Sequence, residues 1–153
     1  MRYTIGNHMV KCPYSVDGDF SLKKALGVML ECNIRHLPIT EGERLVGLVS
    51  DRDLKSAMSL PQAEGLTVAD IMKTELYVAT KTSSLANVVR TMAEQKIGSA
   101  LVVNERMECL GIFTTTDALE ILADLLESED DSSNILGFKD YVDYWHMPQV
   151  ENF

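Results

Sequence analysis

Apolar and polar residues follow one another in the same order twice along the chain. Two stretches, 21–32 and 84–95, carry apolar residues three or four positions apart, the spacing that predicts an amphipathic helix. Ser21 and Ser84 stand at the starts of these stretches, where a hydroxyl can accept hydrogen bonds from the first free amides of a helix. Two short apolar runs joined by a turn then follow each predicted helix, which is typical of a hairpin of buried strands. These runs are 36–39 and 45–49 in the first case and 100–103 and 110–113 in the second.

The two halves of this pattern are copies of one unit. Residues 4–9 (TIGNHM) reappear 63 positions later as residues 67–72 (TVADIM). One extra residue in the second copy then makes the offset 64, and this offset pairs Asp53 with Asp117. A short strand is expected before each long helix, near 14–16 and 77–79, and a further helix after each hairpin, starting near Asp51 and Thr115. The repeated unit is therefore predicted to be β-α-β-β-α.

This repeat predicts an α/β fold, more closely described as α+β. About 60 residues form only a marginal core alone, so we expect the two copies to pack sheet against sheet. Such packing creates a cleft with approximate two-fold symmetry. The expected boundaries are 4–60 for the first repeat, 61–66 for a turn-rich linker, 67–127 for the second repeat and 128–153 for an acidic and aromatic tail.

The tail is predicted to contain a short amphipathic helix. Phe138, Tyr141, Val142 and Trp145 share one helical face, and the helix is expected to end before Pro148. This face can pack on its own module or on a partner subunit. We favour the partner subunit, because five of the ten aromatic residues lie in the tail and aromatic side chains are typical of interface centres.

The formal net charge of −9 is unevenly distributed. Residues 1–117 hold 14 acidic and 13 basic side chains, whereas residues 118–153 hold 9 acidic side chains and one lysine. A nearly neutral body can accept an anionic ligand, but the acidic tail is repelled by nucleic acid and by anionic membranes. No apolar run approaches the roughly 20 residues of a membrane span. We therefore expect no nucleic acid and no membrane among the partners.

The cysteines and the first residues favour a cytoplasmic location. The three cysteines are an odd number without a closely spaced pair, which argues against a disulfide framework or a zinc site and favours a reducing compartment. Residues 1–6 lack the apolar stretch of a secretory signal. His8 and His146 lack a second ligand at metal spacing, so no metal is expected.

The candidate chemistry lies where each hairpin runs into its following helix. Ser50 precedes Asp53 by three residues, and Thr114 precedes Asp117 in the same way, at the predicted start of a helix. One interpretation is a capping box, in which hydroxyl and acid satisfy the first amides of the helix. The other is a ligand site, because free amides attract phosphate and a fixed carboxylate accepts hydrogen bonds from ribose hydroxyls. Both can hold, since a capped acid is also preorganised.

These segments and the strands before them resemble the CBS domain pattern. The resemblance rests on residues 34–54 (IRHLPITEGERLVGLVSDRDL) and their second copy at 97–117, and it extends over roughly residues 4–127. It implies a tandem pair, or Bateman module, in a pseudo-two-fold arrangement. It also implies a regulatory adenosine nucleotide in the central cleft (AMP, ADP or ATP, with S-adenosylmethionine less favoured), no obligatory cofactor, and a homodimer.

The resemblance further implies roles for individual residues. Asp53 and Asp117 match the aspartate that holds the ribose, and Ser50 and Thr114 match the hydroxyl near ribose or phosphate. The adenine slot is implied to be lined by Tyr14, Val16 and Pro38 in the first copy and by Tyr77, Thr80 and Ala100 in the second.

The two predicted sites differ in charge. We call the junction between each hairpin and its following helix a corner. Three basic side chains lie near the first corner, where cations can neutralise phosphate: Arg35, His36 and Arg52. The matching places in the second copy carry glycine and hydroxyl residues. The Asp53 site is therefore expected to favour the more highly phosphorylated ligand. His36 has a second interpretation, as a polar side chain satisfied at a strand start.

The predicted function is a nucleotide-sensing module without catalysis of its own. Ligand state would pass to an unknown effector protein through a change in the packing of the repeats or of the dimer. One alternative is a structural dimerisation module with vestigial clefts. Another is a small enzyme using Asp53 or Cys12, although the sequence shows no acid–base or nucleophile–base constellation for it.

Overall fold

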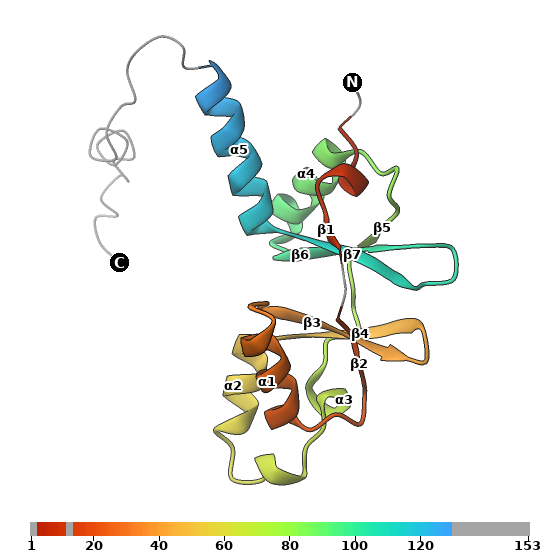
Figure 1. Cartoon of the computed structure of the whole chain (residues 1–153), viewed down its shortest axis with the longest axis vertical. Coiled ribbons are helices and arrows are strands. Elements are labelled where there is room, and N and C mark those ends of the chain that lie inside the picture. The colour runs from red at the N-terminus through yellow and green to blue at the C-terminus, as the bar shows by residue number, and fades with distance from the viewer. Residues whose placement is uncertain (1–2, 12–13, 130–153) are drawn as a thin grey trace, which may run out of the picture. The chain divides into compact units, whose positions relative to one another are not determined.

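The computed structural model describes residues 3–11 and 14–129 (Figure 1). The chain divides into two units, Met1–Ala118 and Leu119–Phe153. Both hairpins lie in the first unit, and the second unit is described over residues 119–129, where it continues the last helix. The predicted tail helix lies outside the described residues. Within the described ranges, no helix is long and apolar enough to cross a bilayer.

The first copy folds as its sequence pattern predicts. Its sheet has the order β2 (Val16–Asp17), β3 (His36–Glu41) and β4 (Arg44–Ser50), with α1 (Leu22–Glu31) before β3 and α2 (Asp51–Met58) after β4. Strand β2 is parallel to β3, and β3 is antiparallel to β4. The helical spacing of Leu22, Ala25 and Met29 places all three in the core of this copy. Ser21 caps α1 as expected, because its hydroxyl accepts from the Lys24 amide at 3.4 Å.

The second copy repeats this order. Its elements are α3 (Val68–Ile71), β5 (Val78–Ala79), α4 (Leu85–Gln95), β6 (Ser99–Val103), β7 (Cys109–Thr114) and α5 (Thr115–Glu129), and 3-10 turns lie at Ile5–Asn7 and Ala63–Gly65. Ser84 occupies the N-cap position of α4, but the prediction for its hydroxyl is wrong, because it makes no capping hydrogen bond. Its main chain pairs with Thr4 in an isolated bridge. The predicted α+β fold with two β-α-β-β-α units is confirmed.

The leading segments of the two copies are exchanged, so that each one packs on the other copy. Strand β1 (Val10–Lys11) joins the second sheet antiparallel to β7, and the Ile5 amide donates to the Ser83 carbonyl at 3.0 Å. In return, the Val68 amide donates to the Phe20 carbonyl at 2.8 Å, and Val68 is buried in the first core. The two contacts are equivalent under the 63-residue offset of the repeat. The exchange therefore obeys the pseudo-two-fold symmetry, and the sequence pattern did not predict it.

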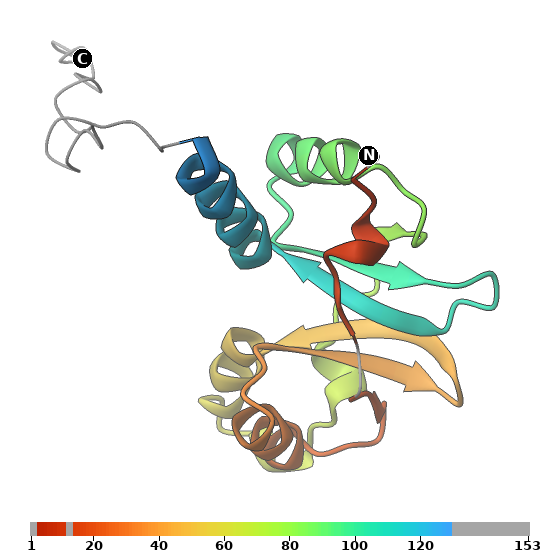
Figure 2. The same ribbon diagram turned by 45° about the horizontal axis from the view of Figure 1, so that its top comes forward.

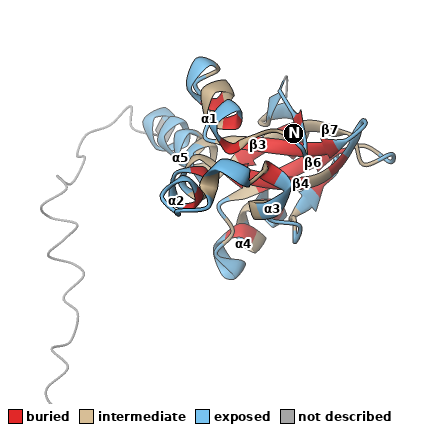
Figure 3. Cartoon of the chain, turned by 90° about the horizontal axis from the view of Figure 1, so that it is seen from below, coloured by how far each residue is buried: buried red, intermediate tan, exposed pale blue. Residues whose placement is uncertain are grey.

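The two sheets face each other at the centre of the first unit (Figure 2). Leu45 and Leu48 of β4 pack with Leu101 and Val103 of β6. The Leu45 amide also donates to the Met107 carbonyl at 2.9 Å. The buried residues lie on the strands and on the helix faces that pack against them, while the outer faces of the helices are exposed (Figure 3). Packing of sheet on sheet therefore forms a core shared by the two copies, in addition to the core between helices and sheet in the first copy.

Two glycines let the exchanged segments lie close to the sheets. A Cβ atom at Gly111 would lie 2.5 Å from the Sδ of Met9, and a Cβ atom at Gly47 would overlap Met72. Met72 is the C-cap residue of α3, and Met9 follows the C-cap of the first 3-10 turn. Each methionine therefore lies within an exchanged segment and packs where only a glycine leaves room for it.

Candidate ligand-binding site

The corner where β4 enters α2 is a capping box. The Ser50 hydroxyl donates to Oδ2 of Asp53 at 2.6 Å, and the Ser50 amide donates to the same oxygen at 3.2 Å. The Asp53 amide in turn donates to Oγ of Ser50 at 3.1 Å. The Asp51 amide donates to the Arg35 carbonyl at 3.0 Å, which ties the start of α2 to the segment before β3. None of these contacts uses Oδ1 of Asp53.

Asp53 is held in its ionised form. Partial burial alone would raise the pKa of Asp53, but hydrogen bonds from the Ser50 hydroxyl and amide, together with Lys73 and His36, bring it below its ordinary value. Lys73 places its Nζ 3.8 Å from Oδ2 of Asp53. Lys73 was not predicted from the sequence, because this residue belongs to the second copy and reaches the first corner only through the exchange of leading segments.

His36 lies directly beside this corner, since it pairs with Ser50 across β3 and β4. Burial is the main cause that lowers the pKa of His36; Asp51 and Asp53 oppose this shift, and Lys73 and Arg35 reinforce it. The imidazole is therefore neutral near pH 7, where it can donate or accept one hydrogen bond but supplies no full positive charge.

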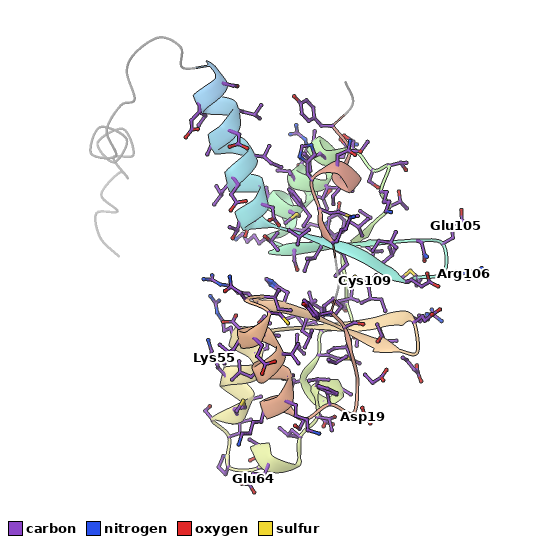
Figure 4. All side chains as sticks on the ribbon, viewed as in Figure 1. Asp19, Lys55, Glu64, Glu105, Arg106 and Cys109 are labelled. Atoms are coloured by element: carbon purple, nitrogen blue, oxygen red, sulfur yellow. The ribbon has the colours of Figure 1, made fainter. Side chains whose placement is uncertain are left out.

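A basic pocket opens at the start of α2, next to the same corner. It has a volume of about 520 Å³ and is lined by Arg35, Asp51, Arg52, Lys55 and Ser56. Lys55, which extends from α2 in Figure 4, forms an ion pair with Asp51 at 3.1 Å. The structure thus brings the predicted cations Arg35 and Arg52 together. It also adds Lys55, which was not predicted. Its position four residues after Asp51 in the predicted helix could have indicated this ion pair from the sequence.

The second corner repeats the capping box. The Thr114 amide and hydroxyl donate to Oδ2 of Asp117 at 2.6 and 2.7 Å, and the Asp117 amide donates to Oγ1 of Thr114 at 3.3 Å. The Thr115 amide donates to the Gly98 carbonyl at 3.1 Å, as Asp51 does to Arg35 in the first copy. The geometry is therefore shared, and the two corners differ in the side chains around it.

The residues predicted for the adenine slots fall into two groups. Val16, Pro38 and Ala100 are buried in the strands, while Tyr77 is half-buried. Thr80 is exposed, and its hydroxyl lies 3.2 Å from those of Thr82 and Ser83. Tyr14 is exposed, and a hydrogen bond with Cys32, at the C-cap of α1, raises the pKa of its phenol. The apolar strand residues therefore have the burial that a slot wall needs, whereas Tyr14 bonds with the end of α1 and Thr80 with neighbours in its own segment.

A smaller pocket lies near the turns of the two hairpins. Its volume is about 280 Å³, and its lining includes Thr40, Glu43 and Glu108 but neither of the two aspartates at the corners. Among residues 3–11 and 14–129, no group of three or more His, Cys, Asp or Glu residues could hold a metal ion. This pocket was not predicted from the sequence.

A third pair of a hydroxyl residue and an aspartate, at the start of another helix, serves as an internal comparison. Thr67 donates from its amide and hydroxyl to Oδ2 of Asp70 at 2.7 and 2.9 Å, at the start of α3. These two bonds lower the pKa of Asp70, whose side chain is exposed. A hydroxyl and an acid at a helix start therefore do not define a ligand site alone. The Asp53 corner adds Lys73, His36 and a basic pocket to this arrangement.

Comparison with known proteins gives consistent matches over both copies. The CBS domain family model matches residues 5–60 and 68–124. The CBS domain pair of protein MJ0100, solved in complex with 5′-methylthioadenosine and S-adenosyl-L-methionine, has a TM-score of 0.74 and 24% identity, over 82% of this chain and 99% of that one. CBSX2 from Arabidopsis thaliana, solved in complex with AMP, has a TM-score of 0.70 and 25% identity, over 81% and 98%.

A curated relative shows that a similar segment also occurs within a longer protein. The homoserine O-acetyltransferase of Methanosphaera stadtmanae is 28% identical over 125 residues, which cover 75% of this chain. The chain spans only 25% of the length of that relative.

Proposed function

The chain belongs to the CBS domain family, and from this premise we propose that it is a regulatory module that binds a phosphorylated adenosine ligand at the Asp53 corner. The ligand is AMP, ADP or ATP, and S-adenosylmethionine is the weaker fit. In this proposal the ribose hydroxyls donate to Asp53, Ser50 lies beside them, and Arg35 and Arg52 neutralise the phosphate. Val16 and Pro38 supply apolar contacts to the adenine.

This proposal rests on one observation, that the Asp53 carboxylate is fixed in place and ionised. Ser50 fixes the carboxylate through two hydrogen bonds to Oδ2, and these bonds help to hold it ionised. A fixed acceptor loses little conformational freedom when a ligand binds, so more of the interaction energy contributes to affinity. Because the capping contacts leave Oδ1 unused, a ribose can approach without breaking the cap.

The charges around the corner favour a phosphate-bearing ligand. Arg35, Arg52 and Lys55 line one pocket, and arginine can bind phosphate oxygens in a bidentate manner. CBSX2, solved with AMP, supports an adenosine nucleotide as the ligand class. The Asp117 corner carries Gly98, Ser99 and Thr116 at the equivalent places. We therefore assign the more highly phosphorylated ligand to Asp53, and Thr114, Asp117, Tyr77, Thr80 and Ala100 to a second, less basic cleft.

A regulatory role follows from how the two copies are connected. Lys73 lies on the segment that the second copy lends to the first, and it contacts Asp53 directly. A ligand at Asp53 therefore changes a contact between the copies, and this change can pass to a partner subunit in a homodimer and to an effector protein in the cytoplasm. The size of the signal is limited by the difference in ligand affinity between the two packing states.

Calorimetry on the full chain with AMP, ADP, ATP and S-adenosylmethionine tests this proposal. We expect binding of at least one phosphorylated nucleotide and weaker binding of S-adenosylmethionine. Native mass spectrometry of the purified protein adds the mass of any retained ligand and the number of subunits. Absence of binding for all four compounds would contradict the proposal and favour an interaction module with vestigial clefts.

The interaction module is a second candidate because of the surface of α5. Leu119, Leu122 and Leu126 share one helical face, and their exposed fractions are 65%, 50% and 56%. Contiguous exposed apolar side chains mark interaction surfaces on soluble proteins. A dimer formed through this face is compatible with ligand binding at Asp53, so the two functions can coexist.

A further inference from the structure

Lys73 reaches the Asp53 corner from the other copy of the repeat. Its main chain is fixed on β4, because its amide donates to the Leu48 carbonyl at 2.9 Å and its carbonyl accepts from the Leu48 amide at 3.0 Å. Its ammonium lies 3.8 Å from Oδ2 of Asp53. The Lys73 side chain is 69% exposed, so the ammonium can move to another anion while its backbone stays in place.

The equivalent position in the other corner carries no charge. Val10 matches Lys73 under the 63-residue offset. It pairs with Ile112 of β7, as Lys73 pairs with Leu48 of β4. At this matched position, the exchange therefore places an ammonium group on the strand that leads to Asp53 and an isopropyl group on the strand that leads to Asp117. The capping boxes themselves are alike.

We propose that Lys73 determines the ligand specificity of the Asp53 cleft, by selecting adenosine ligands that carry a phosphate over those that share only the base and ribose. This inference rests on the proposed function, because it assumes an adenosine ligand whose ribose contacts Asp53. It is a property of this cleft alone, since Val10 stands at the matching place in the other.

The physical reason is a competition for one carboxylate. In the ligand-free protein, the Lys73 ammonium compensates part of the Asp53 charge. Ribose hydroxyls that donate to Asp53 weaken this pair. A phosphate gives the ammonium a replacement anion, with a hydrogen bond strengthened by charge on both partners. A neutral 5′-methylthioadenosine gives it none.

Neutral and charge-preserving variants of Lys73 separate these contributions. The full chain with Asp117→Asn is the parent, because this change removes the carboxylate of the second cleft while it keeps an oxygen that can cap α5. Lys73→Met removes the charge and keeps an unbranched side chain, and Lys73→Arg keeps the charge. Lys23→Met, on the exposed first turn of α1, controls for the loss of one positive charge elsewhere.

Calorimetry with ADP and with 5′-methylthioadenosine, at low and at moderate salt, gives the readout. We expect Lys73→Met to weaken ADP binding about tenfold, the loss of one charged hydrogen bond, and to reduce its salt dependence. Binding of 5′-methylthioadenosine should stay equal or strengthen. Lys73→Arg should retain most of the ADP affinity, and Lys23→Met should match the parent.

Three results would overturn the inference. If Lys73→Met binds ADP as tightly as the parent, Lys73 does not select phosphate, and the proposed function stands. If ADP and 5′-methylthioadenosine weaken equally, Lys73 supports the shape of the cleft rather than its specificity. If the parent binds neither compound, the proposed function fails at this cleft and the inference fails with it, a result distinct from the first two.

Discussion

Met72 packs directly against Gly47, on the strand that leads to the candidate ligand site. A Cβ atom added to Gly47 would overlap the Sδ and Cγ of Met72 and lie 3.0 Å from its Cβ. Met72 belongs to the second copy by sequence, whereas Gly47 belongs to the first, so this contact holds the exchanged segment in place. The segment also carries Lys73, and the packing of Met72 therefore helps to position a charge beside Asp53.

Gly47→Ala should destabilise the fold by about 1–2 kcal/mol, the usual cost of one extra methyl group in a packed site. The flexible end of Met72 can yield partly, so the cost stays below that of a clash with main-chain atoms. Urea denaturation followed by circular dichroism measures the free energy of unfolding. Adding Met72→Ala should cost less in the Gly47→Ala background than in the wild type. Strictly additive costs would show that the two residues do not press on each other.

Gly27→Ala should have the opposite effect. Gly27 lies inside α1, and a Cβ atom there would meet no atom within 4 Å. Alanine in a helix interior is more stable than glycine by about 0.5–1 kcal/mol, so the midpoint of urea denaturation should rise. A lower midpoint for Gly27→Ala would contradict the open space that the structure shows at this position.

Local features of the fold could be predicted from the sequence. The spacing of Leu22, Ala25 and Met29 depends only on the period of a helix, and the capping box joins Ser50 and Asp53, which are three positions apart. The repeat itself made the second corner predictable once the first was recognised. In each case, residues close in sequence determine the geometry.

The exchange between the copies could not be predicted in this way. The repeat fixes which residues are equivalent, but it does not state whether Val68 packs on its own copy or on the other. Both arrangements satisfy the same hydrophobic pattern, and only the contact of Val68 with Phe20 decides between them. The predicted site therefore lacked Lys73, whose distance from Asp53 in the sequence gives no local signal.

Asp53→Ala should weaken nucleotide binding by about 1–3 kcal/mol, because ribose hydroxyls would lose their acceptor in a partly buried site. The substitution also removes half of a capping box, so a loss of stability must be separated from a loss of contact. Asp70→Ala is the matched control, since Asp70 makes the same bonds with Thr67 at another helix start. Calorimetry should show an effect for Asp53→Ala alone. Equal losses of nucleotide affinity in both variants would show that the loss comes from a disturbed fold and not from a missing contact with the ligand.

Leu122→Ser tests whether the apolar face of α5 joins two copies of the chain. Leu122 lies between Leu119 and Leu126 on this face and is 50% exposed. Replacing a central apolar contact should raise the dimer dissociation constant by at least about tenfold, measured by sedimentation or native mass spectrometry. Leu60→Ser, at another exposed leucine, is the control and should leave the subunit number unchanged. A dimer that tolerates Leu122→Ser would place the interface elsewhere.

Acid should destabilise the protein through His36 before its carboxylates titrate. Burial lowers the pKa of His36 below 6.5, so the unfolded chain binds a proton at a pH where the folded protein does not. This contribution to stability is complete above about pH 6.5 and is lost as the pH falls, with a slope of at most about 1.4 kcal/mol per pH unit for one proton. The pKa values of Asp51 and Asp53 are lowered from 3.8, so the stability that these two carboxylates contribute is lost at a pH below this value. Urea denaturation between about pH 7.5 and 5.5 should therefore show a smaller slope for His36→Gln than for the wild type. An equal slope in the two proteins would mean that His36 is free to take up a proton in the folded state.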